Sequence, residues 1–439
     1  MKKDFFKIIS EEVANFEKTN SLKELRYSGI ELWPIIRIGY YMARKKQISN
    51  YPPPRKLSRF ILRFKRLLLD YKYKFKKKSL EGKTTLYFGA NTYRVKLNNR
   101  RINRYFTYKI EEEAVLIEYD NSLLYLDKKS IDNRELIDFL LLKKDREKIS
   151  SDKLFINTLN IFKPFLGNLY SEVLSFTLSV LAFEKQYYKL MSVSTLKSIF
   201  LLSYYSAPAL GATIAANKRN IKTVEVQHGP IGETHLAYSS SSFYNLSKSN
   251  VLPKHIHLWH ECFIPYVRGT FNSIKVTGNY YLNTYKSNGS NKKKNKILIS
   301  LQPKDSSGLE NNYKDVLRSF KEDTQIIIRL HPRLVKSKIL LKDIKYFKNQ
   351  NITVSDPYKT PLHEDLNNSF IHLTGYSGTT IEALILGIPT ILLDNKSSNF
   401  FYNLKNENII HFCFGIKADN LIQLIKSYKP SNDNLIVNS

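Results

Sequence analysis

Three short segments that combine histidine, hydroxyl and glycine residues each follow an apolar run. The first, residues 227–230, reads Gln-His-Gly-Pro and places His228 directly after the run 223–226. Histidine titrates near neutral pH, so at the end of a strand it is suited to act as a general base that deprotonates a hydroxyl group. The alternative interpretation is a turn histidine that caps backbone groups.

The second segment, residues 329–333, reads Arg-Leu-His-Pro-Arg and follows the isoleucine run 326–328. Arg329, His331 and Arg333 would bring hydrogen-bond donors to a phosphate or diphosphate group. The proline after His331 would end the strand and fix the turn, which makes His331 the better candidate. Arg329 still lies within the predicted strand, where it could instead pair with a neighbouring carboxylate.

The third segment, residues 374–383, reads Thr-Gly-Tyr-Ser-Gly-Thr-Thr-Ile-Glu-Ala and separates a predicted strand from a predicted helix. Its small residues would let backbone amides approach an anion, and the amino end of the helix favours negative charge. The candidate phosphate-binding residues are Ser377, Gly378, Thr379 and Thr380. Serine and threonine are also ordinary helix caps, with Glu382 in the first turn, so a structural interpretation stays open.

Alternating strands and helices would position these segments. Residues 198–202, 207–218 and 223–226 read as strand, helix and strand, which predicts a βαβ unit with parallel strands. The alternation restarts at residue 296, after a run rich in lysine and asparagine at 288–295. We therefore expect an α/β fold with two doubly wound domains, residues 83–287 and 296–439, and ligands at the carboxyl ends of the strands in the cleft between the domains.

Residues 1–82 are expected to form a helical amino-terminal segment. A first helix is predicted over residues 22–45, with Pro34 in its first turn. Residues 55–83 carry twelve lysine and arginine residues, with apolar residues at helical spacing. A basic amphipathic helix is typical of binding to an anionic membrane surface. It could also pack on its own domain and leave its lysines in solvent.

The composition limits the class of protein. The 439 residues have a formal net charge of +30, which favours anionic partners. The two cysteines, Cys262 and Cys413, are far apart, which fits a reducing compartment. The amino terminus does not read as a signal peptide, and the longest apolar stretches, 173–183 and 198–216, are interrupted or too short and polar to predict a membrane span, so we expect a soluble or peripheral protein.

Metal chemistry finds little support in the sequence. The cluster of His255, His257, His260, Glu261 and Cys262 has no recognised metal-binding spacing, and residues 251–259 read better as a loop followed by a strand. The chain contains no Asp-x-Asp motif, so we expect a metal-independent mechanism and no cofactor.

The order of these motifs resembles a known family. Arg-x-His-Pro, then Ser-Gly-Thr-Thr-x-Glu-Ala, then Gly387-x-Pro389 before a strand is similar to the donor half of GT-B glycosyltransferases, including Kdo-transferase-like and sialyltransferase-like enzymes of capsule and lipopolysaccharide assembly. The Gln-His-Gly turn resembles the Trp-His-Gly of the teichoic acid glycerophosphotransferases. The resemblance covers residues 296–394 and, in the amino-terminal half, residues 198–238.

This resemblance implies roles for individual residues. His228 would be the base, His331, Ser377 and Thr379 would bind the donor phosphate, and Glu382 would lie near the ribose. Gln227 replaces the tryptophan of the glycerophosphotransferases, and sialyltransferase-like families use an acidic base. The acidic residues that flank the turn, Glu225 and Glu233, therefore stay candidates for the base.

The expected function is transfer of a sugar from a nucleotide-sugar donor to a glycan or lipid-linked acceptor of surface polysaccharide, with inversion. CMP or CDP is slightly favoured over UDP by resemblance. The expected location is the cytoplasm, peripheral at the inner face of the plasma membrane. The alternatives are a polyol-phosphate transferase with a CDP-activated donor, a sugar-nucleotide 2-epimerase and a basic nucleic-acid-binding protein. The last lacks any recognised nucleic-acid-binding motif, so no nucleic acid is expected as a partner.

Overall fold

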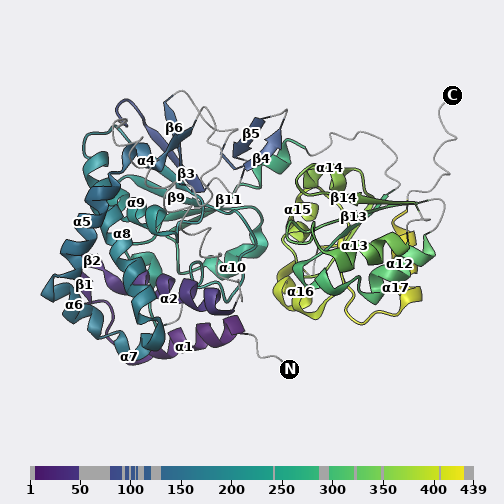
Figure 1. The fold of residues 1–439 in the computed structure, drawn as a ribbon, viewed down its shortest axis with the longest axis horizontal. Coiled ribbons are helices and arrows are strands. Elements are labelled where there is room, and N and C mark those ends of the chain that lie inside the picture. The colour runs from purple at the N-terminus through teal and green to yellow at the C-terminus, as the bar shows by residue number, and fades with distance from the viewer. Residues whose placement is uncertain are drawn as a thin grey trace. The chain divides into compact units, whose positions relative to one another are not determined.

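The computed structural model describes residues 5–48, 80–90, 94–97, 100–103, 105–106, 113–119, 130–240, 243–285, 296–320, 324–347, 351–404 and 407–429. The chain forms two compact units, Met1–Thr277 and Gly278–Ser439 (Figure 1). Most of the predicted basic helix at 55–83, the predicted strand at 122–126 and the predicted linker at 288–295 lie outside the described residues.

The first unit is built on a seven-stranded parallel sheet with the order β11-β10-β9-β8-β3-β6-β7. The chain winds outward from the centre in both directions, so the order reverses between β3 and β8. The strands are β3 (Thr85–Ala90), β6 (Ala114–Tyr119), β7 (Ser130–Asp132), β8 (Ser198–Leu201), β9 (Lys222–Val226), β10 (His255–Leu258) and β11 (Ser273–Val276). This is a doubly wound sheet, as predicted.

The predicted βαβ unit is confirmed by β8, β9 and the helix between them, α9 (Ala207–Lys218). Ser206 caps this helix by accepting a hydrogen bond from the Ala209 amide, and a proline stands in its first turn. The strands β8 and β9 pair in parallel, with Leu201 opposite Glu225. The carboxyl ends of these two strands therefore lie next to each other.

Helices surround this sheet. The first unit contains α1 (Phe5–Thr19), α2 (Leu32–Ile48), α4 (Asn133–Leu136), α5 (Phe139–Ser150), α6 (Lys153–Asn160), α7 (Lys163–Leu166), α8 (Tyr170–Met191) and α10 (Ile264–Val267). It also contains two short antiparallel pairs, β1 (Arg26–Tyr27) with β2 (Ile30–Glu31) and β4 (Arg94–Leu97) with β5 (Arg100–Asn103). The predicted helix with Pro34 in its first turn is confirmed as α2, but it begins at Leu32 and not at residue 22, because residues 26–31 form the hairpin β1–β2. Helices α1 and α2 belong to the first unit.

One stretch of the described residues, Lys163–Met191, is long and apolar enough to cross a membrane by length and composition. Its main part is α8, whose residues Val173, Val180 and Tyr187 are fully buried in the first unit. Helix α8 packs against α9, α2 and α5. In this structure it is a core helix of the unit.

The second unit is built on a six-stranded parallel sheet with the order β14-β13-β12-β15-β16-β17. The strands are β12 (Lys296–Ser300), β13 (Gln325–Arg329), β14 (Ile352–Ser355), β15 (Ile371–Thr374), β16 (Thr390–Leu392) and β17 (Ile410–Phe412). The helices are α11 (Tyr280–Asn283), α12 (Asn311–Ser319), α13 (Lys338–Tyr346), α14 (Leu362–Asn367), α15 (Thr379–Ile385), α16 (Asn395–Phe400) and α17 (Ala418–Ser427). The order reverses between β12 and β15, which confirms a second doubly wound unit.

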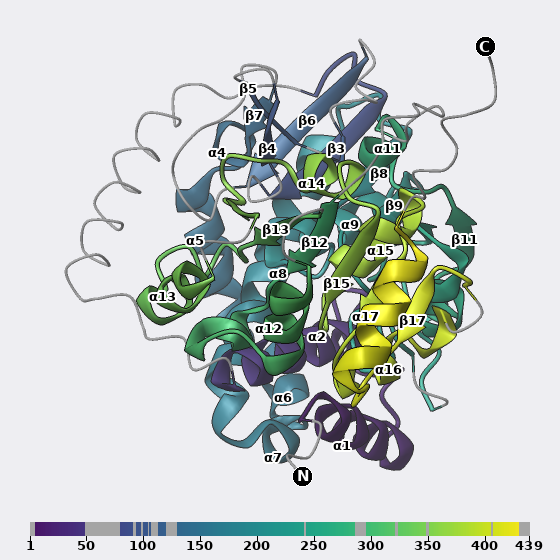
Figure 2. The ribbon, with the colours of Figure 1, turned by 90° about the vertical axis from the view of Figure 1, so that its right-hand side faces the viewer.

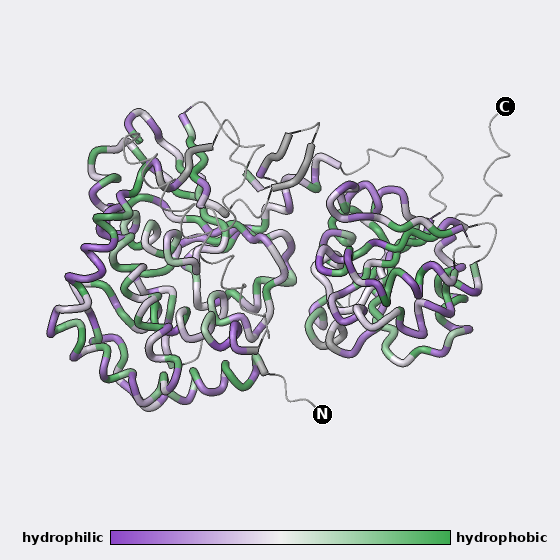
Figure 3. The backbone as a smooth tube through the Cα atoms, viewed as in Figure 1, coloured by the Kyte–Doolittle hydropathy of each residue, from purple (hydrophilic) through white to green (hydrophobic). Residues whose placement is uncertain are grey.

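Alternating residues of the central strand bury themselves on opposite faces of this second sheet. Ile297 and Ile299 pack in the same core as helices α12, α13 and α17, whereas Leu298 packs in the core of α14 and α15. Figure 2 shows α12 and α17 in front of the sheet. In the second unit, hydrophobic residues gather along the strands of the sheet (Figure 3). Both faces are covered, as a parallel sheet requires.

The boundary between the units precedes the predicted linker. Residues 278–285 pack on α14, because the Tyr281 hydroxyl hydrogen-bonds Nδ1 of His363 at 3.1 Å and the Tyr285 ring stacks on the same imidazole. Burial, and then the positive charge of Arg329, lower the pKa of His363 to about 4. The imidazole is therefore neutral at physiological pH and belongs to the structure of the second unit.

Candidate functional site

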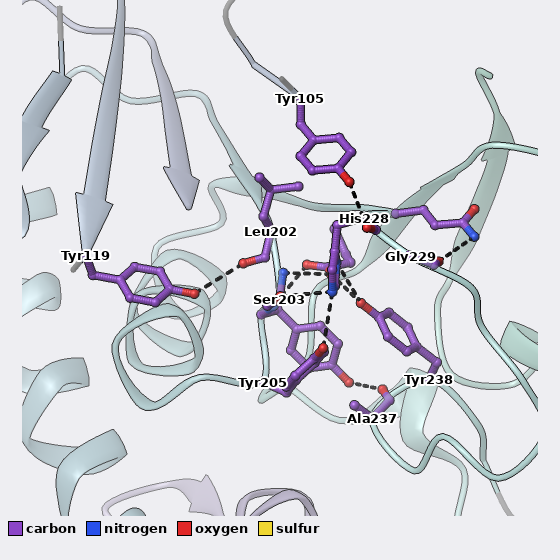
Figure 4. A network of polar contacts seen from close by, with 12 residues as sticks. Tyr105, Tyr119, Leu202, Ser203, Tyr205, His228, Gly229, Ala237 and Tyr238 are labelled. Atoms are coloured by element: carbon purple, nitrogen blue, oxygen red, sulfur yellow. Dashed lines mark hydrogen bonds and ion pairs between the residues drawn. The ribbon is translucent and has the colours of Figure 1, made fainter. Parts of the chain in front are cut away.

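His228 lies just beyond the carboxyl end of β9, in a turn that Gln227 fixes. The Gln227 side chain is fully buried, accepts a hydrogen bond from the Trp259 amide at 2.7 Å and donates one to the carbonyl of Gly229 at 2.9 Å. Tyr105 donates from its hydroxyl to the carbonyl of His228 at 2.8 Å (Figure 4). A glutamine here is thus the residue that ties the turn to the next strand, β10.

Both ring nitrogens of His228 meet polar groups (Figure 4). Nε2 lies 3.0 Å from Oγ of Ser203 and 3.2 Å from the hydroxyl of Tyr205. Nδ1 lies 3.6 Å from the carboxylate of Glu225 and 3.5 Å from the hydroxyl of Tyr238. The side chain is 12% exposed, so it reaches the surface of the first unit. An acidic group behind Nδ1 favours an imidazole whose Nε2 accepts protons.

Glu225 is the carboxylate that the structure brings to His228. It is fully buried and accepts hydrogen bonds from the amides of Ser203 and Tyr204 and from the hydroxyl of Tyr238, the last at 2.6 Å. Burial raises the pKa of the Glu225 carboxyl above its ordinary value, against the opposing effect of His228 and these donors. Glu233, the other acidic candidate, is exposed in the loop that follows. Glu225 is therefore placed to orient the imidazole.

Ser203 is a member of this site that the sequence analysis missed. It follows β8 at the point where the strand order reverses, and its φ of +57° is unusual for a residue other than glycine. That backbone conformation aims its amide at Glu225 and its hydroxyl at His228. A serine after an apolar strand is too common to single out, so the sequence offers no specific signal for it.

The loop after the His228 turn is anchored by the amino-terminal helices. Arg37 in α2 donates to the carbonyls of Leu236 and, at 2.8 Å, Ser239. Its guanidinium also pairs with Glu17 of α1 at 3.1 Å, and both side chains are almost fully buried. Trp33 donates to the same carboxylate at 2.8 Å. Helices α1 and α2 thus help to position the site.

His235 stands in this anchored loop among aromatic rings. Its ring centroid lies 5.0 Å from that of Tyr41, 5.4 Å from that of Tyr205 and 4.8 Å from that of Tyr238. Burial, then the ammonium of Lys45 and His228, lower the pKa of His235 to about 3. It is therefore neutral where His228 would act as a base, and it adds no positive charge to the site.

In the second unit, the guanidinium of Arg329 is bound by groups of the protein itself. Its guanidinium pairs with Asp365 at 2.5 Å and donates to Oγ of Ser355 at 3.3 Å and to the carbonyl of Thr360 at 2.9 Å. The side chains of Arg329 and Asp365 are 11% and 7% exposed. This geometry favours the alternative given by the sequence analysis, pairing with a neighbouring carboxylate, over phosphate binding.

His331 lies after β13 and is partly buried. Its Nδ1 accepts a hydrogen bond from the Arg333 amide at 3.2 Å, which closes the turn. Burial, and then the charge of Arg333, lower the pKa of His331. With Nδ1 used as an acceptor, the neutral ring carries its proton on Nε2, which a ligand oxygen could accept.

The segment after β15 caps the short helix α15. Oγ of Ser377 accepts hydrogen bonds from the amide of Thr379 at 3.2 Å and from its hydroxyl at 2.9 Å. Gly378 immediately precedes the helix, and Thr380 and Glu382 are buried in its first turn. Ser377 and Thr379 are partly exposed, so they form the accessible part of the segment. The cap and the phosphate site remain compatible, because the Ser377 oxygen can still donate its own proton.

Two further groups, His372 and Lys304, lie at this sheet edge. Buried His372 hydrogen-bonds Ser300 through Nε2 at 3.0 Å and Thr390 through Nδ1 at 3.2 Å, which ties β15 to both neighbouring strands. Lys304 follows β12 and pairs with Asp394, after β16, at 3.1 Å. Asp394 in turn accepts from the Tyr376 amide at 3.0 Å. These residues join the ends of three strands at the reversal of the strand order, where doubly wound sheets bind ligands.

The described residues contain no group of three or more histidine, cysteine or acidic side chains that could hold a metal ion. His255 and His257, considered in the sequence analysis, lie in the parallel strand β10, as expected from the loop-then-strand interpretation.

No protein-family model matches the sequence, and no curated protein matches it significantly. Several solved structures match the chain over most of its length, at low identity and low TM-score. The UDP-GlcNAc 2-epimerase of Methanocaldococcus jannaschii is 14% identical, with a TM-score of 0.44 over 80% of this chain and 93% of that one. The glycosyltransferase of kitacinnamycin is 9% identical, with a TM-score of 0.43 over 80% and 92%. The calicheamicin glycosyltransferase CalG4 is 10% identical, with a TM-score of 0.36 over 80% and 91%.

Proposed function

We propose that this chain is a glycosyltransferase of the GT-B type, which moves a sugar from a nucleotide-activated donor to a hydroxyl group of an acceptor. The observation that carries the proposal is the setting of His228. Its Nδ1 faces the Glu225 carboxylate and its Nε2 faces hydroxyl groups at the carboxyl edge of a parallel sheet. A histidine held in this way is suited to take a proton from a hydroxyl nucleophile.

The second unit would bind the donor. Strands in a sheet lie about 4.8 Å apart, so the loops after β13 and β15, two positions apart, are roughly 10 Å apart. His331 in the first loop and Ser377 in the second could contact phosphate oxygens of one nucleotide. Lys304 in the loop between them, after β12, adds a positive charge, although Asp394 and Glu310 partly neutralise it.

The reaction would be a direct displacement at the anomeric carbon. His228 removes the proton of the acceptor hydroxyl, and the donor site stabilises the negative charge of the departing nucleotide. We propose that the acceptor is a glycan or lipid-linked chain of surface polysaccharide at the cytoplasmic face of the membrane. The support for this acceptor and location is the basic segment 55–83 and the net charge of +30.

Nucleotide binding tests the donor half of the proposal. We would measure the melting temperature of the purified protein with CMP, CDP, UDP, GDP and TDP. A nucleotide present at about 100 times its Kd should stabilise the folded protein by roughly 2.7 kcal/mol. We expect His331→Ala and Ser377→Ala to lose this effect, whereas Ser319→Ala, an exposed helical serine of the same unit, should keep it. Binding unchanged in both site variants would contradict the assignment.

Product analysis tests the reaction. Incubation of the protein with a matching nucleotide sugar and candidate acceptors should add the mass of one sugar to the acceptor. Addition of a phosphate with the transferred group would indicate a polyol-phosphate transferase. Conversion of the nucleotide sugar without any acceptor would indicate a 2-epimerase, and either result would replace the proposal.

A further inference from the structure

Two hydroxyl groups stand at the nitrogen that would act as the base. Ser203 and Tyr205 place their oxygens 3.0 Å and 3.2 Å from Nε2 of His228 (Figure 4). The carboxylate of Glu225, 3.6 Å from Nδ1, favours the tautomer protonated on Nδ1, which leaves Nε2 with one in-plane lone pair. A hydroxyl of Ser203 or Tyr205 therefore occupies the direction from which a substrate proton would arrive.

The two hydroxyl groups differ in their access to solvent. Ser203 is 7% exposed, and its amide is held by Glu225. Tyr205 is partly exposed, so its side chain borders the surface of the first unit. A substrate approaching from solvent would meet Tyr205 before Ser203.

Aromatic contacts on several sides hold the Tyr205 ring. It lies edge-on to Tyr238, with centroids 5.9 Å apart and an interplanar angle of 87°, and edge-on to Tyr204 at the same distance. The His235 ring lies 5.4 Å away. Such contacts favour one position of the ring, so swinging the hydroxyl away from His228 would cost stabilising interactions. The geometry favours a hydroxyl that stays in place during the reaction.

We propose that Tyr205 relays the acceptor proton to His228, an inference that rests on the proposed transferase function. The acceptor hydroxyl donates to the oxygen of Tyr205, whose own proton moves to Nε2 of His228. The acceptor oxygen forms its bond to the anomeric carbon, and the bond from that carbon to the nucleotide phosphate breaks with its electron pair on the phosphate. Tyr205 ends the step with one proton, as it began, and His228 becomes an imidazolium. Ser203 is a positioning residue, because its amide donates to the Glu225 carboxylate that faces Nδ1 of the ring.

The variants Tyr205→Phe and Tyr238→Phe form a matched pair that tests the relay. The first removes the hydroxyl at Nε2 of His228, and the second removes the hydroxyl at Nδ1. We expect Tyr205→Phe to lower kcat by roughly 100-fold or more, the range of a lost proton-transfer group, with unchanged nucleotide binding. A Tyr205→Phe protein that keeps the wild-type kcat, or exceeds it, would overturn the proposal. Equal melting temperatures of the two variants would show that folding is not the cause.

A second measurement needs no variant. The transfer rate of the wild-type protein is measured in mixtures of H₂O and D₂O, under conditions where chemistry limits the rate. Two protons moving together give a curved dependence on the deuterium fraction, and direct removal by His228 gives a straight line. A straight line would refute the relay.

A third measurement is independent of transferase activity and separates failure of this inference from failure of the proposed function. Diethylpyrocarbonate acylates accessible imidazole nitrogens, and peptide mass mapping reports the modification of His228. If the Tyr205 hydroxyl covers Nε2, Tyr205→Phe should speed up this modification several-fold, whereas Tyr238→Phe should not. An unchanged rate in Tyr205→Phe would overturn the relay even for a protein in which no transfer is detected.

Discussion

The carboxylate of Glu225 lies 3.6 Å from Nδ1 of His228, three residues further along the chain. Glu225 is the last buried residue of β9, and His228 lies in the turn that directly follows this strand. One strand and its turn therefore supply both the base and the carboxylate that orients it. The Tyr238 hydroxyl bridges them from the following loop.

We expect Glu225→Gln to lower the transfer rate by about 100-fold while the nucleotide still binds. An amide cannot provide the negative charge that favours an imidazole protonated on Nδ1. The measurement is kcat together with the nucleotide-dependent shift in melting temperature. Glu233→Gln is the matched control, because this residue is exposed in the loop and should leave the rate nearly unchanged. A larger loss in Glu233→Gln would make Glu233 the functional carboxylate.

Arg329→Met should destabilise the second unit by about 3–5 kcal/mol, because it leaves the carboxylate of Asp365 buried and unpaired. Arg333→Ala, four residues away and exposed, should change stability by less than about 0.5 kcal/mol. Urea unfolding of both variants checks this difference. If the two arginines proved equally dispensable for folding, Arg329 would again be a candidate for phosphate binding.

Acid should weaken the second unit through His372. Burial lowers the pKa of this histidine from 6.5 to about 3. Below pH 6.5, His372 therefore binds a proton in the unfolded chain but stays neutral in the folded chain. The contribution of neutral His372 to the free energy of unfolding is fully present above pH 6.5. It decreases as the pH falls, and the loss is about 2 kcal/mol at pH 5. His372→Gln should remove this part of the pH dependence, measured by urea unfolding at pH 7 and pH 5. Identical losses in wild type and variant would exclude His372 as the cause.

Arg37→Met should destabilise the first unit by about 3–5 kcal/mol, because Glu17 would keep its charge in a buried position. It should also reduce transfer, since the loop that carries Tyr238 loses its anchor at Leu236 and Ser239. Arg44→Met is the control: its pair with Glu12 is partly exposed, and its loss should cost about 1 kcal/mol or less. Thermal unfolding and kcat of both variants provide the comparison.

Periodic apolar runs predicted most of the second unit. Buried strands such as β13 are continuous runs of isoleucine, and this pattern is typical of parallel sheets covered on both sides. Strand β11 of the first unit, Ser273–Val276, was missed because it lies at a sheet edge, is mostly exposed and has only two apolar residues, too few to stand out in the sequence. The same reason applies to the short strand β17, Ile410–Phe412, where only Ile410 is buried.

The sequence predicted only those residues of the candidate site that stand in a short, distinctive segment next to a strand. His228 and Ser377 stand in short segments with distinctive residues next to strands. Ser203, Tyr205 and Tyr238 come to His228 through the pairing of strands and the folding of a loop, and no local pattern marks them. The structural role of Arg329 depends on Asp365, 36 residues later, which the sequence could not pair with it.

The contact between Arg37 and Leu236 joins positions 199 residues apart. During translation, α2 is synthesised long before the loop that contains Leu236 and Ser239, to which Arg37 of α2 donates. During that interval Arg37 can pair with Glu17, but its carbonyl partners do not yet exist, and the apolar surface that α2 buries against α8 is still uncovered. The amino-terminal helices therefore cannot reach their final packing during early synthesis, and completion of the His228 site requires a contact that closes over 199 residues of the chain.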